Sequence, residues 1–134
     1  MKVFIDTNVL LDVSLERKDF YTDSAKVLSL AAFKEIEGCI TATTTTDLFY
    51  IIRKHYNIQK AKTDLKNYLT FLNILPVNEN VIRLALTSDF KDFEDAVQYF
   101  SCSIFDCTCI VTRNVGDFKE AKLPVYTPKE FLLK

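Results

Sequence analysis

Short apolar runs alternate along the chain with longer segments in which apolar residues recur every three or four positions. The runs have the length of buried strands, and the longer segments have the period of amphipathic helices. This alternation is typical of β-α units, which build a parallel sheet with helices against its faces. The fold is therefore expected to be α/β. Strands are expected at residues 2–5, 39–42, 74–77, 107–112 and 124–127.

Cap and stop residues set the expected bounds of the helices. A helix over residues 20–37 would end at Gly38, because glycine is favoured just after the last turn. Thr44 and Asp47 form a T-x-x-D capping pattern that would open a helix through about Tyr56. Further helices are expected at residues 58–72, from Asn78 to about Ser88, at 92–104 with Phe93, Val97, Phe100 and Ile104 buried, and from Pro128 onward.

The size of the chain suits one domain. It has 134 residues, of which 49% are hydrophobic, and this is enough for a single core over residues 1–134. No stretch approaches the roughly 18 apolar residues that a membrane helix needs, and Asp6 interrupts the N-terminal apolar run early. These features favour a cytoplasmic protein without a membrane partner.

Cysteine and histidine offer little for catalysis. Cys39, Cys102, Cys107 and Cys109 lack the spacing of zinc ligands, so reduced and mostly buried thiols are expected. The only histidine, His55, has no second histidine to support a Ser-His or Cys-His scheme. Any chemistry must therefore be carried by carboxylates, hydroxyls or lysines.

The charge balance excludes a simple polyanion-binding module. Seventeen Lys and Arg residues against eighteen Asp and Glu residues give a net charge of −1. A protein that held nucleic acid by phosphate neutralisation alone would be visibly basic. A nucleic-acid role must therefore depend on a local site with a few cations.

Polar side chains follow several of the expected strands. In open parallel sheets, ligands bind beyond the carboxyl ends of the strands, where the strand order reverses. Asp6 follows the first strand, and the segment around Asp47 follows the second. The loop after the fourth strand supplies Thr112, Arg113, Asn114 and Asp117. A site rich in carboxylates is expected at this edge.

Four motifs occur in the order of one known family. They are VFIDTNVLLD at residues 3–12, an acid in the helix after the second strand, Asp95-Ala96 in a late helix, and IVTRNVGDF at residues 110–118. In these motifs the chain resembles the PIN-domain family of metal-dependent ribonucleases, over nearly its whole length. The resemblance implies a three-layer α/β/α sandwich with a central parallel sheet in the order 3-2-1-4-5. It also implies Mg²⁺ or Mn²⁺, hydrolysis of RNA phosphodiester bonds, and, for many small bacterial members, the role of toxin in a toxin-antitoxin pair.

The resemblance carries four catalytic acids over to this chain. They are Asp6, Asp47, Asp95 and Asp117, of which Asp6, Asp95 and Asp117 would hold the metal. Contacts with substrate, or support for the ligands, are expected from Thr7, Asn8, Thr112, Arg113 and Asn114. The chain departs from the family at Asp47, where glutamate is usual, and at Asn114, where aspartate is common.

Each acid also has a structural alternative, which is to cap a helix or to favour its first turn. The alternatives are Asp6 as the cap of a helix beginning near Asn8, Asp47 as the capping-box partner of Thr44, Asp117 as the cap of residues 117–121, and Asp92 or Glu94 in place of Asp95.

An acidic site of this kind suits a hard divalent cation. Mg²⁺ is held by one or two carboxylates together with water and phosphate oxygens. The ion would relieve the repulsion between clustered carboxylates and lower the pKa of a bound water molecule. The expected function is a metal-dependent endoribonuclease, the toxin of a type II toxin-antitoxin pair, with RNA as substrate and an antitoxin protein or a second copy as partner. The alternative is a catalytically weakened PIN-like module that binds RNA or a protein.

Overall fold

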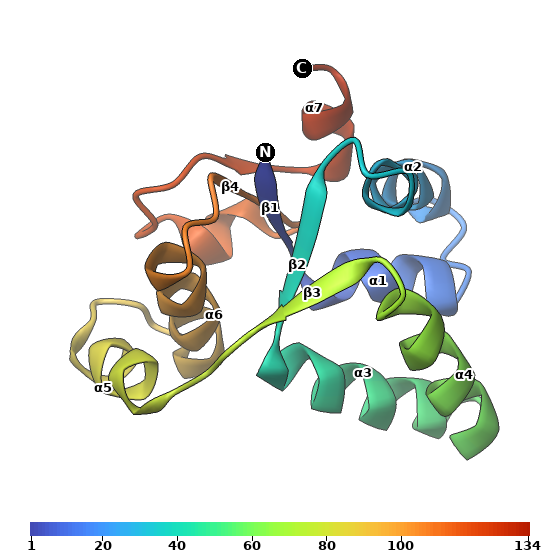
Figure 1. Cartoon of the computed structure of the whole chain (residues 1–134), viewed down its shortest axis with the longest axis horizontal. Coiled ribbons are helices and arrows are strands. Elements are labelled where there is room, and N and C mark those ends of the chain that lie inside the picture. The colour runs from blue at the N-terminus through green and yellow to red at the C-terminus, as the bar shows by residue number, and fades with distance from the viewer.

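The computed structural model, which describes residues 1–134, contains one sheet of five parallel strands (Figure 1). The strands are β1 (Lys2–Ile5), β2 (Glu37–Thr41), β3 (Leu72–Leu75), β4 (Cys109–Val111) and β5 (Val125–Tyr126). Their order across the sheet is β3-β2-β1-β4-β5, which confirms the expected order. The central strand β1 therefore pairs with β2 on one side and with β4 on the other.

Helices cover both faces of this sheet (Figure 1). Their bounds are α1 (Thr7–Ser14), α2 (Tyr21–Ala32), α3 (Ala42–His55), α4 (Ile58–Tyr68), α5 (Glu79–Thr87), α6 (Phe93–Ile104), the 3₁₀ helix η1 (Val115–Phe118) and α7 (Pro128–Leu132). One face carries α1 to α4 and α7, and the other carries α5, α6 and η1. The fold is thus the expected three-layer α/β/α sandwich. No helix combines the length and the apolar character that crossing a membrane would require.

The side chains of β1 join the two halves of the core. Val3 and Ile5 point into the apolar cluster on the α1 side, while Phe4 points into the cluster that contains Tyr99 of α6. All three β1 side chains are inaccessible to solvent. Successive side chains in a strand point to opposite faces, so a strand covered on both faces needs an apolar residue at every position. This packing fixes where the chain emerges at Asp6.

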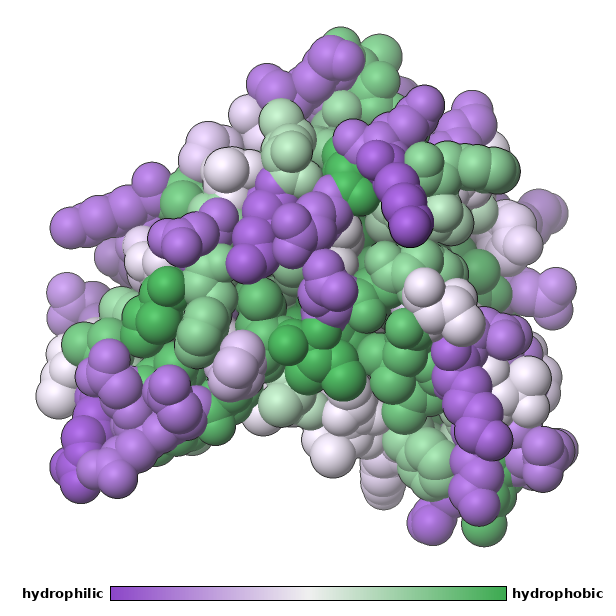
Figure 2. Space-filling view, in the orientation of Figure 1, coloured by the Kyte–Doolittle hydropathy of each residue, from purple (hydrophilic) through white to green (hydrophobic).

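The side of the molecule near β3 is less well covered. Figure 2 shows apolar side chains across the centre of this face, which is hollowed between two groups of helices. Ile74 of the edge strand β3 is 46% exposed. The open edge of the sheet therefore presents apolar surface.

Gly38 has a different role from the expected one. The helix α2 ends at Ala32, earlier than expected, and Lys34 takes the left-handed conformation after it with φ 62°. Gly38 does not end a helix; it lies within β2. A Cβ atom there would lie 2.6 Å from Leu72 Cδ2 and 2.9 Å from Ala31 Cβ. Glycine is needed because β3 and α2 approach this strand closely.

The cap of α3 also differs from the expectation. Thr41 Oγ1 accepts a hydrogen bond from the Thr44 N–H, and Thr44 Oγ1 accepts one from the Thr41 N–H, each at 3.3 Å. The expected capping box of Thr44 and Asp47 is wrong, because the helix begins at Ala42, directly after β2. Asp47 lies inside α3 and is not used by the cap.

Other helix starts agree with the sequence. Asn78 and Thr127 cap α5 and α7 as expected, and Asp92, the expected start of α6, caps that helix. The expected burial of Phe93 is wrong, since this side chain is 48% exposed. Phe93 is the first residue of α6, and the helix enters the core only at its next turn, where Val97 is buried.

The four cysteines are free and buried, as expected. A hydrogen bond with the Cys102 thiol raises the pKa of Cys107 to about 12, and burial adds to this rise. Burial also raises the pKa of Cys109. These thiols therefore stay protonated and act as small apolar side chains.

We predict that Gly38→Ala lowers the free energy of unfolding by about 1–3 kcal/mol, the usual range for overpacking a core. The added methyl group would displace Ala31 and Leu72. Urea unfolding followed by circular dichroism measures the change. Gly116→Ala is the matched control, because no atom lies within 4 Å of the Cβ position at Gly116. Equal stability of the two variants would contradict the role given to Gly38.

Candidate active site

Asp6 and Thr112 meet because β1 and β4 are paired. Ile5 lies opposite Val111 in this pairing, so the next residue of each strand emerges at the same edge of the sheet. Thr112 Oγ1 donates a hydrogen bond to Asp6 Oδ2 at 2.7 Å, across 106 positions of sequence. This edge lies where the strand order reverses, which is where ligands bind in parallel sheets.

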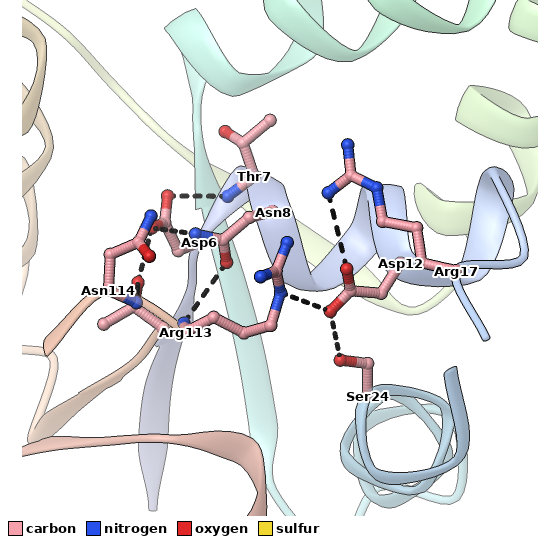
Figure 3. Close-up of polar contacts among 9 residues, drawn as sticks. Asp6, Thr7, Asn8, Asp12, Arg17, Ser24, Arg113 and Asn114 are labelled. Carbon is pink, nitrogen blue, oxygen red and sulfur yellow. Dashed lines mark hydrogen bonds and ion pairs between the residues drawn. The ribbon is translucent and has the colours of Figure 1, made fainter. Parts of the chain in front are cut away.

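The Asp6 carboxylate is surrounded by hydrogen-bond donors (Figure 3). Its Oδ1 accepts a hydrogen bond from the Thr7 N–H at 2.7 Å and so caps α1. Its Oδ2 accepts from Thr112 and also from Nδ2 of Asn8 at 3.3 Å. A carboxylate has about four acceptor positions, so one remains for a further contact. Capping and a functional role are therefore compatible at Asp6.

Opposing effects act on the charge of Asp6. Burial is the largest of them and raises the pKa of Asp6, and the charge of Asp117 raises it further. Hydrogen bonds from Thr112 and Thr7 lower the pKa, as does the positive charge of Arg113. The donors therefore partly offset the preference for the neutral acid that burial creates.

Asp95, on the first turn of α6, belongs to the same electrostatic cluster. Burial is the main cause that raises the pKa of Asp95 to about 7. The negative charges of Asp92, Asp117, Asp6 and Glu94 add to the rise, in that order. The structure thus brings Asp95 close enough to Asp6 and Asp117 for the three charges to repel one another.

Glu94 is a second acid of this turn, which the sequence presented only as a rival of Asp95. Burial raises the pKa of Glu94 to about 7, and a hydrogen bond with Asp47 and the charge of Asp47 raise it further. The cap of α6 is supplied by Asp92, whose Oδ1 accepts from the Asp95 N–H at 3.0 Å. One carboxylate is enough for a cap, so the excess of acids in this turn was the signal that could have identified Glu94.

The loop after β4 delivers Asn114 and Asp117. The Asn114 N–H donates to Thr112 Oγ1 at 3.0 Å, which ties the start of the loop to the hydroxyl that contacts Asp6. Asp117 lies within η1 and is exposed, and no side chain caps this helix. The structural alternative for Asp117, capping a helix, is therefore not observed.

The donor set fits a hard divalent cation. The acids at this edge provide only oxygen ligands, which Mg²⁺ and Mn²⁺ prefer. As the side chains stand, no three of them are close enough together to enclose an ion. Mg²⁺ is commonly held by one or two carboxylates with water completing its coordination, so a fully formed cage is not required. A cation would also relieve the repulsion that raises the pKa values of Asp95 and Glu94.

A buried ionic cluster supports the site from behind (Figure 3). Asp12 of α1 is inaccessible to solvent, and its Oδ2 accepts from Nε of Arg113 at 2.9 Å and from Oγ of Ser24 at 2.8 Å. Its Oδ1 lies 3.4 Å from Nη1 of Arg17. The Arg113 guanidinium also stacks on the Phe20 ring, with 4.0 Å between Cζ and the ring centroid. Arg113 is therefore held mainly by α1 and α2.

This cluster fixes the segment that follows β4. The Arg113 N–H donates to Oδ1 of Asn8 at 3.4 Å, while the Arg113 side chain reaches Asp12. Thr112, which precedes Arg113, is thereby kept against Asp6. The sequence reasoning missed Asp12, although a charged residue at the end of the apolar run VLLD was a visible signal.

The fold and the acids beyond the ends of β1 and β4 together define the class of protein. It is an α/β protein with a carboxylate site where the strand order of its sheet reverses. The chain matches the family model of the PIN domain over residues 2–116. It belongs to the PIN domain family, and the resemblance seen in its motifs is confirmed.

Several known proteins are similar to this chain. Ribonuclease VapC1 of Aquifex aeolicus is 27% identical over 135 residues, covering 97% of this chain and 92% of that protein. The structure of VapBC2 from Rickettsia felis, bound to a DNA fragment from their promoter, matches with a TM-score of 0.70 at 17% identity over 93% of this chain and 97% of that one. A toxin-antitoxin complex from Klebsiella pneumoniae matches with a TM-score of 0.69 at 20% identity over 94% and 97%. The solved structures confirm the fold.

We predict that Asp12→Asn lowers the free energy of unfolding by about 3 kcal/mol, the lower end of the range for breaking a buried ion pair. The lower end applies because the side chains of Arg17 and Arg113 keep partial access to solvent. Urea unfolding measures the loss. The control is Glu79→Gln, which breaks the exposed pair with Arg83 and should change stability by less than about 0.5 kcal/mol. A loss no greater than in this control would contradict the supporting role of Asp12.

Asp95→Asn should raise the melting temperature of the metal-free protein at pH 8. The pKa of Asp95 is raised from 3.8 to about 7 by folding, so ionised Asp95 destabilises the fold increasingly as the pH rises through this range and fully above it. At pH 4.5 the gain should be much smaller, because the folded protein keeps the proton. Thermal unfolding in EDTA compares the two pH values. An equal rise in melting temperature at both pH values would contradict the proposed repulsion between Asp95 and its neighbouring acids. A similar rise in the control Glu35→Gln, which changes an exposed acid, would also contradict it.

Proposed function

We propose that the protein is a metal-dependent endoribonuclease that hydrolyses RNA phosphodiester bonds, and that it acts as the toxin of a type II toxin-antitoxin pair. The observation that carries this proposal is the buried Asp6, fixed by Thr112 at the sheet edge and in the electrostatic field of acids from α6 and η1. The name of the Aquifex relative, a ribonuclease, and the toxin-antitoxin complex from Klebsiella support it.

Asp6, Asp95 and Asp117 are the proposed metal ligands. When bound, Mg²⁺ or Mn²⁺ would lower the pKa of a water molecule and neutralise charge on the scissile phosphate. The donors Thr112, Asn8 and the Thr7 N–H keep the Asp6 carboxylate in one orientation. This orientation is set before substrate arrives, so little has to be reorganised during the reaction.

Glu94 and Asp47 are proposed to handle the proton. A pKa of about 7 lets Glu94 gain or lose a proton near neutral pH, which is the condition for general acid-base catalysis. The contact with Asp47 and its negative charge both favour the protonated form of Glu94. The shorter Asp47 side chain therefore acts together with Glu94, and its departure from the family's glutamate does not by itself remove the acid.

The cations near the site are few and local. Lys91 and Lys119 line a hollow between α6 and η1 together with Asp95 and Asp117. We propose that these two lysines bind the phosphates that flank the scissile bond. This placement is consistent with a net charge of −1, because only neighbouring phosphates need to be neutralised.

An antitoxin protein is the proposed partner. A groove between α3 and α4 is lined by Phe49, Tyr50, Arg53 and Leu65, and Tyr50 is 56% exposed. Half-exposed aromatic side chains beside an arginine are common at the centres of protein interfaces. A second copy of the chain, meeting at the open edge near Ile74, is a further proposed partner.

The alternative is a catalytically weakened module that binds RNA or a protein. Asn114 favours it, because an amide adds no negative charge where aspartate is common in the family. The gene directly upstream bears on the toxin role. A small DNA-binding protein encoded there supports a toxin-antitoxin pair, and an isolated gene weakens it.

The test of the proposed function is RNA cleavage by the purified protein with Mn²⁺, Mg²⁺ or EDTA. We expect cleavage with either metal, none with EDTA, and a loss of at least about a hundredfold in Asp6→Asn, because a main ligand is removed. Asparagine is also a good helix cap, so this variant should keep α1 and fold normally. Single-stranded and structured RNA are compared in the same assay.

The control variant is Asp64→Asn, which removes the surface pair with Lys60 on α4 and should cleave like the wild type. Cleavage in EDTA, or cleavage unaffected by Asp6→Asn, would overturn the metal mechanism. Metal binding without any cleavage would favour the weakened module.

A further inference from the structure

The buried side-chain nitrogen and oxygen atoms that lack a hydrogen-bond partner belong to two residues that are close in the chain to acids of the site. They are Oγ1 of Thr7 and both amide atoms, Nε2 and Oε1, of Gln98. Thr7 directly follows Asp6 in the chain, and Gln98 lies one turn along α6 from Glu94. Folded proteins contain few such atoms, and those that exist concentrate where a ligand or water completes their hydrogen bonds.

Gln98 lies beneath the acids of α6. It is 1% exposed, four residues after Glu94 and three after Asp95. At about 100° of rotation per residue, its side chain points between the directions of these two acids, one turn further along α6. Val97 and Tyr99, on either side of Gln98 in sequence, pack into two different apolar clusters. The Gln98 side chain is thus enclosed between packed neighbours, one helical turn from the two acids.

A glutamine at this position is costly unless it has a partner. Burying an unpaired amide destabilises the folded state, whereas leucine or methionine would pack there without that cost. The amide offers two donor hydrogens and one acceptor oxygen. It is also neutral, so it adds polar contacts beneath Asp6, Glu94 and Asp95 without adding to their repulsion.

We propose that Gln98 is a positioning residue that hydrogen-bonds water beside the divalent cation of the site, with Thr7 Oγ1 as a second contact for that water. This inference deepens the proposed function and rests on it. Once the cation is bound, Oε1 accepts a hydrogen bond from the water, and Nε2, which has no partner in the metal-free protein, donates to a site carboxylate. Together these contacts fix how the water and the carboxylate lie relative to each other.

The first test is Gln98→Met, which keeps the length of the side chain and removes the amide. We expect the dissociation constant for Mn²⁺, measured by isothermal titration calorimetry, to rise about 10–100-fold, as for the loss of other groups that support metal ligands. The melting temperature of the metal-free variant should stay the same or rise, because an unpaired amide has been removed. A merely structural glutamine would instead lower the melting temperature and leave the affinity unchanged.

Ser101→Ala is the matched control on the same helix. Ser101 Oγ is buried and donates to the Pro76 carbonyl at 2.7 Å, so its loss should lower the melting temperature without changing the affinity for Mn²⁺. A loss of affinity in this control equal to that in Gln98→Met would overturn the assignment.

The second test uses the wild-type protein and does not depend on a variant that folds. The chain has two glutamines, Gln98 and the exposed Gln59, so the side-chain NH₂ signals of both can be followed by NMR during a titration with Mg²⁺. We expect the Gln98 pair to shift and the Gln59 pair to stay in place. Shifts at the backbone of Asp6 and Asp95 with an unmoved Gln98 pair would overturn this inference alone. No shifts anywhere in the site would overturn the metal-dependent function itself.

Discussion

Repulsion between carboxylates gathered at one edge of the sheet is the constraint on which the rest of the site depends. Burial and like charges raise the pKa values of Asp95 and Glu94 to about 7 and also raise that of Asp6. Such a cluster opposes folding in the absence of a cation. The protein holds it together with apolar packing of β1 on both faces and with donors aimed at Asp6. Stability is given up at this edge, where we propose that an ion and a phosphate bind.

Two parallel links hold the same pair of segments together. Asp6 at the start of α1 bonds to Thr112, and Asp12 within α1 bonds to Arg113, the next residue along. The first link is buried, and the second is partly open to solvent on the Arg113 side. Because both join α1 to the end of β4, neither segment can rotate without breaking at least one of them. The position of the Thr112 hydroxyl, which orients Asp6, therefore depends on the charge pair between Asp12 and Arg113.

Much of the fold could be read from the sequence, for physical reasons that are local. Apolar runs, strand spacing and caps such as Asn78 and Thr127 depend on neighbouring residues, and the family motifs supplied the strand order. Other features depend on partners distant in sequence. The need for Gly38 arises from the approach of Leu72 and Ala31, and the partner that neutralises Asp12 lies 101 residues away. The cap at Thr41 was obscured by a run of threonines, any of which could begin a helix.

The acids at the sheet edge also differ in how far the sequence alone points to them. Asp6 was proposed because a carboxylate that ends a buried strand has few other uses, and in the structure its cap and its bond to Thr112 use different acceptor positions. Glu94 was passed over because acids are favoured at any helix start. Only the approach of α3 to α6 in three dimensions distinguishes it, through the contact with Asp47.

The long separation between Asp6 and Thr112 has a consequence for synthesis of the protein. Strand β1 and its aspartate leave the ribosome before β4, and the threonine that completes the pair follows 106 residues later. Contacts between such distant parts of a chain form only after the intervening chain is present. No nascent fragment that lacks β4 can contain the assembled site. The order of the strands therefore delays assembly, and the acidic edge is completed only after β4 and Thr112 have joined β1.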